Sequence, residues 1–233
     1  MEHAIGSGRF RDLTVEAFVE RLASSEPVPG GGSASAIAGS LGAALVAMVA
    51  GLSVGRERYV AHATTHVEAG AVGRRLADRF LALADEDAAA YAAFAAAMKL
   101  PRGTDDEKAA RTRALRSAAR VAAEVPLACV EACLELVAAT EALAGRSNRN
   151  ASSDLSVASY LAEAAARGAA ENVLVNLPSV GDPSWAAEVS ERVTTLLGRV
   201  ESQAAATRAV VRAATERDPL PAGGLPPMAD PRA

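Results

Sequence analysis

Apolar residues recur at spacings of three and four along most of this 233-residue chain, which is the pattern of amphipathic helices. The first such segment opens at Thr14, whose hydroxyl suits a helix N-cap, and it ends before Pro27. No segment shows the alternation of β-branched and polar residues that is typical of a strand. The sequence therefore predicts an all-α fold.

The second helical segment carries no charge. The stretch from Pro27 to Gly55 contains no Asp, Glu, Lys or Arg, and three consecutive glycines precede its apolar run. We expect Ser33 to cap this helix, and we expect the helix to be central in a bundle and buried on all sides. Its larger apolar residues follow helical spacing: Ile37, Leu41, Leu45, Met48 and Leu52.

The rest of the pattern predicts long helices that complete a single-domain bundle. Their expected ranges are Arg56 to Lys99, Asp105 onward with a kink at Pro126, Val157 toward Asn176, and Trp185 to about Arg217. We divide the chain into a flexible N-terminus (1–12), a helical domain (13–217) and a disordered tail rich in Pro and Gly (218–233).

The charge-free helix also raises the question of a membrane. The 21 residues from Ala34 to Val54 are uncharged and long enough to span a bilayer. Most of them are Ala, Gly and Ser, which gain little on leaving water. A core helix of a soluble bundle is therefore the favoured interpretation, with a membrane span as the alternative.

Composition and charge exclude other classes of function. The formal net charge is −4 and no Lys/Arg cluster is present, so we expect no nucleic-acid partner. Cys129 and Cys133 lie one helical turn apart, which is poor geometry for a disulfide. Buried free thiols are expected, with a redox or metal pair as the alternative, and the absence of a signal peptide favours the cytoplasm. His62 and His66 share a helix face without a third ligand, so we expect solvated side chains and no metal.

Three features depart from a plain bundle. The first is the glycine loop, Gly30, Gly31 and Gly32 followed by Ser33, which leads into the charge-free helix. A helix start exposes free backbone N–H groups, so this segment suits a polar or anionic ligand group. The alternative is a linker between two helices.

The second feature is a polar cluster at the start of a later apolar helix. It comprises Asn148, Asn150, Ser152, Ser153 and Asp154. Simple N-capping explains such residues, but more donors and acceptors are present than one cap needs. A carboxylate there is also a candidate proton-transfer group.

The third feature is Asp87, which falls on the apolar stripe of the helix that contains Leu83 and Tyr91. A carboxylate that faces a core costs several kcal/mol unless it is paired or lines a wet cavity. A small register slip that brings Asp87 to the surface is the alternative.

Together these features resemble the cyclodeaminase/cyclohydrolase family, which includes the cyclodeaminase domain of formimidoyltransferase-cyclodeaminase and the methenyltetrahydrofolate cyclohydrolases. The matching segments cover most of residues 13 to 177. They are LTVEAFVERLASSEPVPGGGSASAIAGSLGAALVAMV, ADEDAAAYAAF, VPLACVEAC and NASSDLSVASYLAEAAARGAAENVLVNL.

The resemblance implies an all-helical, self-associating enzyme that acts on one-carbon units of tetrahydrofolate without a metal or nucleotide cofactor. A cyclodeaminase closes 5-formimidoyltetrahydrofolate to the 5,10-methenyl cation with loss of ammonia, and a cyclohydrolase opens that cation to 10-formyltetrahydrofolate. The alternative is a non-catalytic folate-binding or helical scaffold protein. The partners implied are a folate, further copies of the chain as a homodimer or larger assembly, and a separate formimidoyltransferase if the chain is a cyclodeaminase.

Within that resemblance we assign site residues as hypotheses. Asp154 is the leading acid/base candidate and Asp87 the second. The substrate-binding candidates are the glycine loop, Asn150 and Ser153, with Arg56 for the glutamate tail.

Overall fold

Six α-helices make up most of the residues that the structure, a computed structural model, describes: 8–221 and 225. No strand occurs in this part of the chain, so the all-α prediction is confirmed. The elements are η1 (Phe10–Asp12), α1 (Val15–Leu22), α2 (Gly31–Gly51), η2 (Glu57–His62), α3 (Ala63–Met98), α4 (Asp105–Leu143), η3 (Arg149–Ala151), α5 (Ser152–Val180) and α6 (Pro183–Ala213).

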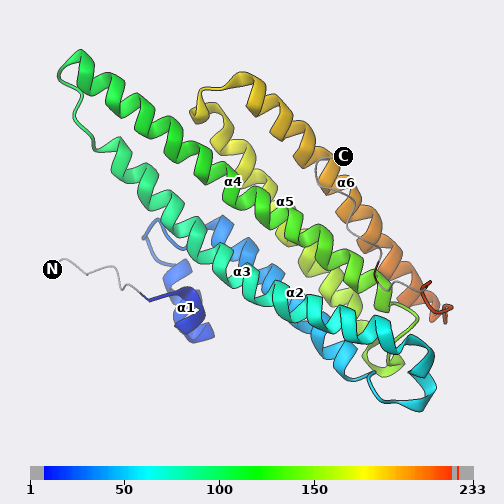
Figure 1. The fold of residues 1–233 in the computed structure, drawn as a ribbon. Helices are drawn as coiled ribbons and strands as arrows, with labels where there is room; N and C mark the ends of the chain where they lie inside the picture. Colours follow the sequence, from blue (N-terminus) through cyan, green and yellow to red (C-terminus); the bar gives the residue numbers. More distant parts are fainter. Residues whose placement is uncertain (1–7, 222–224, 226–233) are drawn as a thin grey trace.

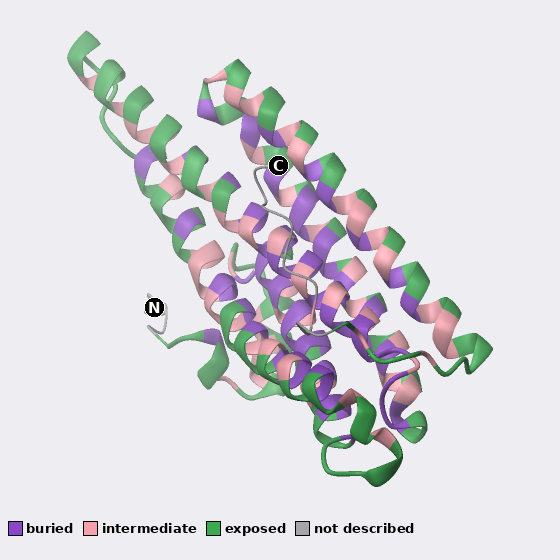
Figure 2. Cartoon of the chain, turned by 45° about the vertical axis from the view of Figure 1, so that its right-hand side comes forward, coloured by how far each residue is buried: buried purple, intermediate pink, exposed green. Residues whose placement is uncertain are grey.

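Four long helices form the core bundle (Figure 1). Helix α2 packs against α3 and α5, and α4 packs against the same two helices, so that α2 and α4 lie diagonally across the bundle. Helix α6 covers α4 and α5 from outside. The purple, buried sides of the helices face one another in Figure 2. This arrangement leaves one side of the α2 and α5 pair on the surface.

The helix starts follow local capping rules. Thr14 caps α1 as predicted, because its Oγ1 accepts a hydrogen bond from the Ala17 N–H at 3.1 Å. Thr104 and Glu107 form a capping box at the start of α4, which begins at Asp105 as predicted. Helix α4 then continues through Pro126 over 39 residues. The helix predicted from Arg56 is instead split, because a 3-10 helix precedes α3.

The buried face of α2 differs from the prediction. Its small residues pack inward, since a Cβ at Gly39 would lie within 2.9 Å of the Phe80 ring. The larger side chains of Leu41, Met48 and Leu52 are 56%, 41% and 42% exposed. The expectation that α2 is buried on all sides is therefore wrong: close helix approach selects the small residues for the core and leaves the large ones outside.

Helix α2 is also the one described helix that is long and apolar enough to cross a membrane. The apolar core helix of a soluble protein has the same length and composition. Helix α2 packs closely against α3 and α5, which agrees with a core helix rather than a membrane span.

Buried thiols and solvated histidines were predicted. Cys129 and Cys133 are buried and free, as predicted. The expectation of solvated histidines is wrong for His66, which is buried with its Nε2 atom 2.8 Å from the Arg146 carbonyl oxygen. His62 is partly buried.

The described residues at the two ends of the chain contact the bundle. Phe10 is buried and its N–H donates to Oδ1 of Asp85 at 2.7 Å, so the segment predicted to be flexible is anchored to α3 from this point. Near the other end, the Arg146 guanidinium donates to the carbonyl oxygen of Asp218 at 2.6 Å. Residues 1–7, 222–224 and 226–233 of the predicted flexible and disordered ends lie outside the described part of the chain.

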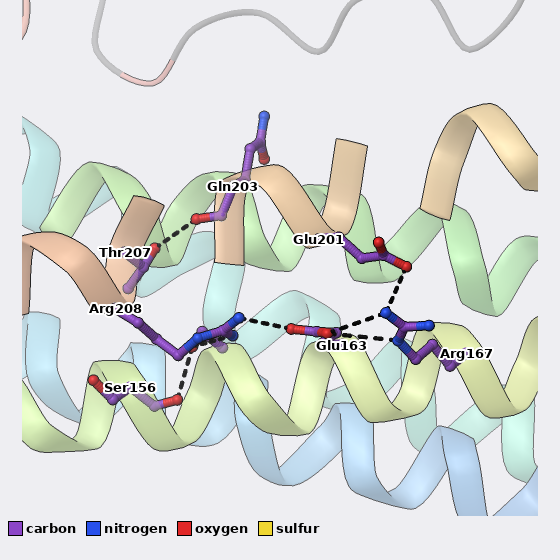
Figure 3. Close-up of polar contacts among 8 residues, drawn as sticks. Ser156, Glu163, Arg167, Glu201, Gln203, Thr207 and Arg208 are labelled. Carbon is purple, nitrogen blue, oxygen red and sulfur yellow. Dashed lines mark hydrogen bonds and ion pairs between the residues drawn. The ribbon is translucent and has the colours of Figure 1, made fainter. Parts of the chain in front are cut away.

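A polar seam joins α6 to α5 (Figure 3). Glu163 on α5 lies 2.9 Å from the guanidinium of Arg208 on α6, and Arg167 on α5 reaches Glu201 on α6 at 2.8 Å. Arg208 also donates to the Ser159 hydroxyl at 3.3 Å. The Glu163–Arg208 pair is partly buried and the Arg167–Glu201 pair is exposed, and both join α6 to α5 in one register.

Candidate functional site

The glycine loop meets α3 at the first turn of α2. Gly30 is the N-cap residue and the helix begins at Gly31, so the prediction that Ser33 is the N-cap is wrong by one turn. Ser33 is instead fully buried inside the first turn. Its hydroxyl is shared between the Ala84 carbonyl oxygen at 3.1 Å and Oδ2 of Asp87 at 2.9 Å.

Asp87 faces this helix start rather than the surface. Burial raises the pKa of its carboxyl group, and hydrogen bonds from the hydroxyl and backbone of Ser33 oppose the rise. The carboxyl group therefore takes up a proton more readily than an exposed aspartate. A raised pKa suits a proton-transfer group, because the two protonation states of the carboxyl group are then closer in free energy at neutral pH than those of an exposed aspartate.

A glycine is needed where Asp87 approaches α2. A Cβ added at Gly32 would lie 2.6 Å from Cγ of Asp87, closer than real Cβ contacts. The N–H groups in the first turn of α2 also have no acceptor within the helix. Gly31 is exposed and Gly32 is buried, so the loop presents backbone donors next to a carboxyl group.

A cleft of about 350 Å³ opens beside this carboxyl group. Helix α3 lines it with Asp87, Tyr91 and Phe94, and the glycine loop forms a second wall. Helix α5 closes it with Val175 and the two asparagines Asn172 and Asn176. Its size falls in the range of small-molecule sites.

The two asparagines are not among the site residues predicted from the sequence. The Asn172 amide nitrogen donates to the Gly168 carbonyl at 2.8 Å, and that of Asn176 donates to the carbonyls of Ala122 and Asn172 at 3.0 and 2.7 Å. Among the described residues no donor bonds to either side-chain oxygen, so both remain acceptors for a ligand in the cleft. In the sequence the two residues stand one helical turn apart in the otherwise apolar run NVLVN, and this spacing was the one sign that they share a helix face.

The other predicted site residues lie at the far end of α2. Asn148 binds the end of that helix, because its N–H donates to the Ser53 hydroxyl at 2.8 Å. The 21 residues of α2 span roughly 30 Å, which separates this end from Ser33. Figure 1 shows the same separation between the start of α2 and the start of α5. Arg56, Asn150, Ser153 and Asp154 belong to this far end.

The structure therefore brings the glycine loop, Ser33 and Asp87 together, and does not bring the polar cluster to them within one chain. The hypothesis that the polar cluster borders the same pocket as the glycine loop and Asp87 is not met within one chain. The physical reason is that α2 and α5 are antiparallel neighbours, so the end of one lies beside the start of the other. Ser152 instead borders a second cleft of about 140 Å³ with Arg58 and Arg149.

Comparison with known proteins decides the family. Residues 14–195 match the sequence profile of formiminotransferase-cyclodeaminase. The chain belongs to this family. The match covers every predicted site residue, at both ends of α2.

Curated members of the formiminotransferase-cyclodeaminase family include proteins of two lengths. A methenyltetrahydrofolate cyclohydrolase of Methylorubrum extorquens is 39% identical over 184 residues, which are 79% of this chain and 88% of that protein. Formimidoyltransferase-cyclodeaminases of Sus scrofa and Rattus norvegicus are 37% and 36% identical over 82% and 83% of this chain. The chain spans only about a third of their length (35% and 36%).

A solved structure shares the fold. A formiminotetrahydrofolate cyclodeaminase from Thermotoga maritima superposes with a TM-score of 0.79, covering 88% of this chain and 98% of that one, at 23% sequence identity. The predicted family and helical architecture are thereby confirmed.

Proposed function

We propose that this chain is a folate one-carbon enzyme that acts on the carbon between N5 and N10 of tetrahydrofolate, and that it does so as a methenyltetrahydrofolate cyclohydrolase. The relative with that name is 39% identical to this chain, and the two formimidoyltransferase-cyclodeaminases are 37% and 36% identical to it. The observation that carries the proposal is the Asp87 carboxyl group. Its pKa is raised by burial, and it lines a cleft beside the free N–H groups of a helix start.

Hydrolysis of the methenyl cation needs one group that accepts and then returns a proton. Water adds to the methenyl carbon and loses a proton, the bond from that carbon to N5 breaks, and N5 takes up a proton. The hydroxyl proton of the adduct leaves as the formyl group forms, so one proton is released overall. Asp87 as a carboxylate accepts the proton of the attacking water, and as an acid returns it to N5.

The same carboxylate also complements the charge of the substrate. The methenyl group is cationic, and a negative side chain in a partly buried cleft stabilises it more than the same side chain does in water. Ser33 holds the carboxylate in place. The N–H groups of Gly31 and Gly32 supply donors for the oxygen that develops on the reacting carbon.

The remaining walls suit a pterin ring. Its N3–H and 2-amino groups are donors, and the side-chain oxygens of Asn172 and Asn176 are matching acceptors. Tyr91 and Phe94 provide aromatic surface on the α3 side of the cleft.

A cyclodeaminase is the second candidate. Its reaction passes through a tetrahedral carbon between the same two nitrogens, with ammonia as the leaving group, and curated relatives carry that name. Neither reaction needs a metal or nucleotide cofactor. We place the enzyme in the cytoplasm as a homo-oligomer, and a cyclodeaminase of this kind receives its substrate from a separate formimidoyltransferase.

One pair of assays tests the proposal. The purified protein is given 5,10-methenyltetrahydrofolate, whose absorbance falls on hydrolysis, and separately 5-formimidoyltetrahydrofolate, from which ammonia is measured. We expect loss of the methenyl absorbance well above the buffer rate. Ammonia release alone supports the cyclodeaminase, whereas a folate-dependent rise in Tm without either turnover supports a non-catalytic binding protein. No turnover and no rise in Tm contradict both enzyme assignments and favour a scaffold.

A further inference from the structure

A second cleft lies at the end of the bundle opposite the glycine loop, where α3 and α5 start and α6 ends (Figure 1). It has a volume of about 140 Å³. Three segments bring charged or titratable side chains to it: Arg58 and His62 from η2, Arg149 from η3, and Glu216 and Arg217 from the residues after α6. No step of the proposed reaction uses this cleft.

Positive charge prevails in the second cleft. Arg58, Arg149 and Arg217 bring three guanidinium groups, and Glu216 is the one carboxylate among the described residues that line it. Arg217 is ion-paired with Glu141, which is not part of the lining. The pair between Arg58 and Glu216, at 2.6 Å, is exposed on both sides and is therefore weak in water. The guanidinium groups of Arg58 and Arg149 thus remain open to a stronger anionic partner.

Arg149 is the cation of the cleft that lacks a partner. Its backbone N–H donates to the Tyr59 hydroxyl at 3.1 Å. Its guanidinium forms no hydrogen bond or ion pair with any residue in the described part of the chain. Ser152 in the first turn of α5 also lines the cleft, and no side chain caps α5, because Ala151 stands at the N-cap position. The partial positive charge of a helix start therefore adds to that of Arg149.

His62 brings an unpaired ring atom to the second cleft. Its Nδ1 atom is buried, and no described residue forms a hydrogen bond with it. Burial lowers the pKa of the His62 ring, and the charges of His66 and Arg146 lower it further. The carboxylates of Asp218 and Glu216 oppose this change. The ring is therefore mainly neutral at pH 7, with one nitrogen that donates and one that accepts. A buried polar atom without a protein partner is commonly paired with a bound molecule.

The wall that the end of the chain contributes is held in place. The Arg217 N–H donates to the Gly145 carbonyl oxygen at 3.0 Å, and the Arg146 guanidinium donates to the Asp218 carbonyl oxygen at 2.6 Å. Gly145 permits this approach, because a Cβ there would overlap the Thr215 carbonyl oxygen. The wall lies after the end of the match to the family profile. The second cleft therefore combines residues of the family domain with a segment outside that match.

We infer that the second cleft binds the phosphate group of a small metabolite, held by Arg58, Arg149 and His62. A phosphate monoester carries a charge of about −1.5 to −2 near pH 7 and has three acceptor oxygens. It therefore matches two guanidinium groups and a ring N–H better than a carboxylate, which has two oxygens and one charge. The apolar part of the metabolite lies against Val210 and Val211, which also line the cleft. The inference is independent of the reaction proposed for the glycine-loop cleft.

Calorimetric titration with three probes tests the choice of ligand. We expect phenyl phosphate to bind once per chain, and at least threefold more tightly than inorganic phosphate, because its ring contacts the two valines. Equal affinities would assign the cleft to free phosphate and overturn the metabolite. Benzoate that binds as tightly as phenyl phosphate would overturn the preference for a phosphate group. No saturation by phenyl phosphate up to about 10 mM would overturn the site.

Three variants locate the bound phosphate. Arg149→Gln removes the unpaired guanidinium and should weaken phenyl phosphate binding at least tenfold. Glu216→Gln should tighten it, because the carboxylate that competes for Arg58 is gone. Arg102→Gln is the matched control, since it removes the same charge from an exposed position between α3 and α4 at the other end of the bundle, and it should bind like the wild type. Equal affinities in all three variants, or weaker binding by Glu216→Gln, would overturn the site.

The His62 ring gives a second readout. A bound dianion favours the charged imidazolium, so the pKa of His62 should rise when phenyl phosphate saturates the protein. The histidine ring signals in NMR spectra measure it, and His62→Gln identifies the signal. An unchanged pKa of His62 at saturation would exclude this residue from the site.

The glycine loop also offers free N–H groups to an anion, so a variant must separate the two clefts. Asp87→Asn removes the carboxylate beside that loop, and it would tighten phosphate binding there because a repulsive charge is lost. We expect Asp87→Asn to bind phenyl phosphate with wild-type affinity. Tighter binding by Asp87→Asn, together with no loss in Arg149→Gln, would place the phosphate at the glycine loop and overturn the inference.

Discussion

Ser33 and Asp87 join the first turn of α2 to α3: the Ser33 hydroxyl lies 2.9 Å from Oδ2 of a carboxyl group whose burial raises its pKa. The serine is fully buried and has one other polar contact, the Ala84 carbonyl. This relationship holds a proton-transfer group at the wall of a cleft, next to the backbone donors of the glycine loop.

Replacing Gly32 should disturb the carboxyl group more than the fold. In Gly32→Ala the new Cβ displaces Asp87 from Ser33, and we expect kcat/KM to fall at least tenfold while the helical circular dichroism is kept. Gly198→Ala is the matched control, because nothing lies within 4 Å of a Cβ at that position of α6. It should raise stability by about 0.5–1 kcal/mol and leave turnover unchanged. Equal kinetics in the two variants would contradict the close-approach argument.

Removing the Ser33 hydroxyl should shift the pH profile. The bonds from Ser33 lower the pKa of Asp87, so Ser33→Ala should raise that pKa further. The acid limb of the kcat/KM profile then moves to higher pH, since the carboxylate must form before it accepts a proton. A limb that stays in place or moves to lower pH would show that Asp87 does not control this step.

The raised pKa of Asp87 also predicts a cost in stability. A group whose pKa is higher in the folded state stabilises the fold most below its unfolded pKa, and this contribution is lost as the pH rises through the folded pKa. Asp87→Asn should therefore have a higher Tm than the wild type at pH 7, with the difference shrinking toward pH 4. Thermal unfolding at several pH values measures it. A lower Tm than the wild type at pH 7 would be the opposite result.

The asparagines should act in binding. In Asn172→Leu the acceptor for a pterin donor is lost, and one unpaired polar group costs about 1–3 kcal/mol, so KM should rise roughly tenfold or more. The chemistry at Asp87 is untouched, and kcat should change little. Asn172→Asp keeps the oxygen acceptors and should have a smaller effect on KM. A loss confined to kcat would exclude a binding role.

Much of the fold follows from the sequence because helix periodicity is local. Thr14 caps the first helix as predicted. The spacing of Leu76, Phe80 and Leu83 predicts one buried helix face, and all three side chains are buried in the structure. The same stripe placed Asp87 toward the interior. The structure shows it beside the glycine loop, where it accepts a hydrogen bond from the Ser33 hydroxyl.

Three features depend on long-range packing that helix periodicity does not encode. Small residues of α2, not its leucines, face the core because helices approach closely where side chains are small. Residues 150–154 lie at the far end of α2 because α5 packs antiparallel beside it. A sequence motif does not reveal this packing. The role of Asn172 needed the cleft, because two asparagines on a helix have many uses.

The most direct test of the account is the turnover of methenyltetrahydrofolate by Asp87→Asn beside the wild type and Glu86→Gln. Glu86 is the neighbouring carboxylate, paired with Arg79 and outside the cleft. We predict that Asp87→Asn lowers kcat/KM by about 10²–10⁴-fold in a folded protein, and that Glu86→Gln stays near the wild-type value. A folded Asp87→Asn enzyme within about threefold of the wild type would contradict the central role of this carboxyl group.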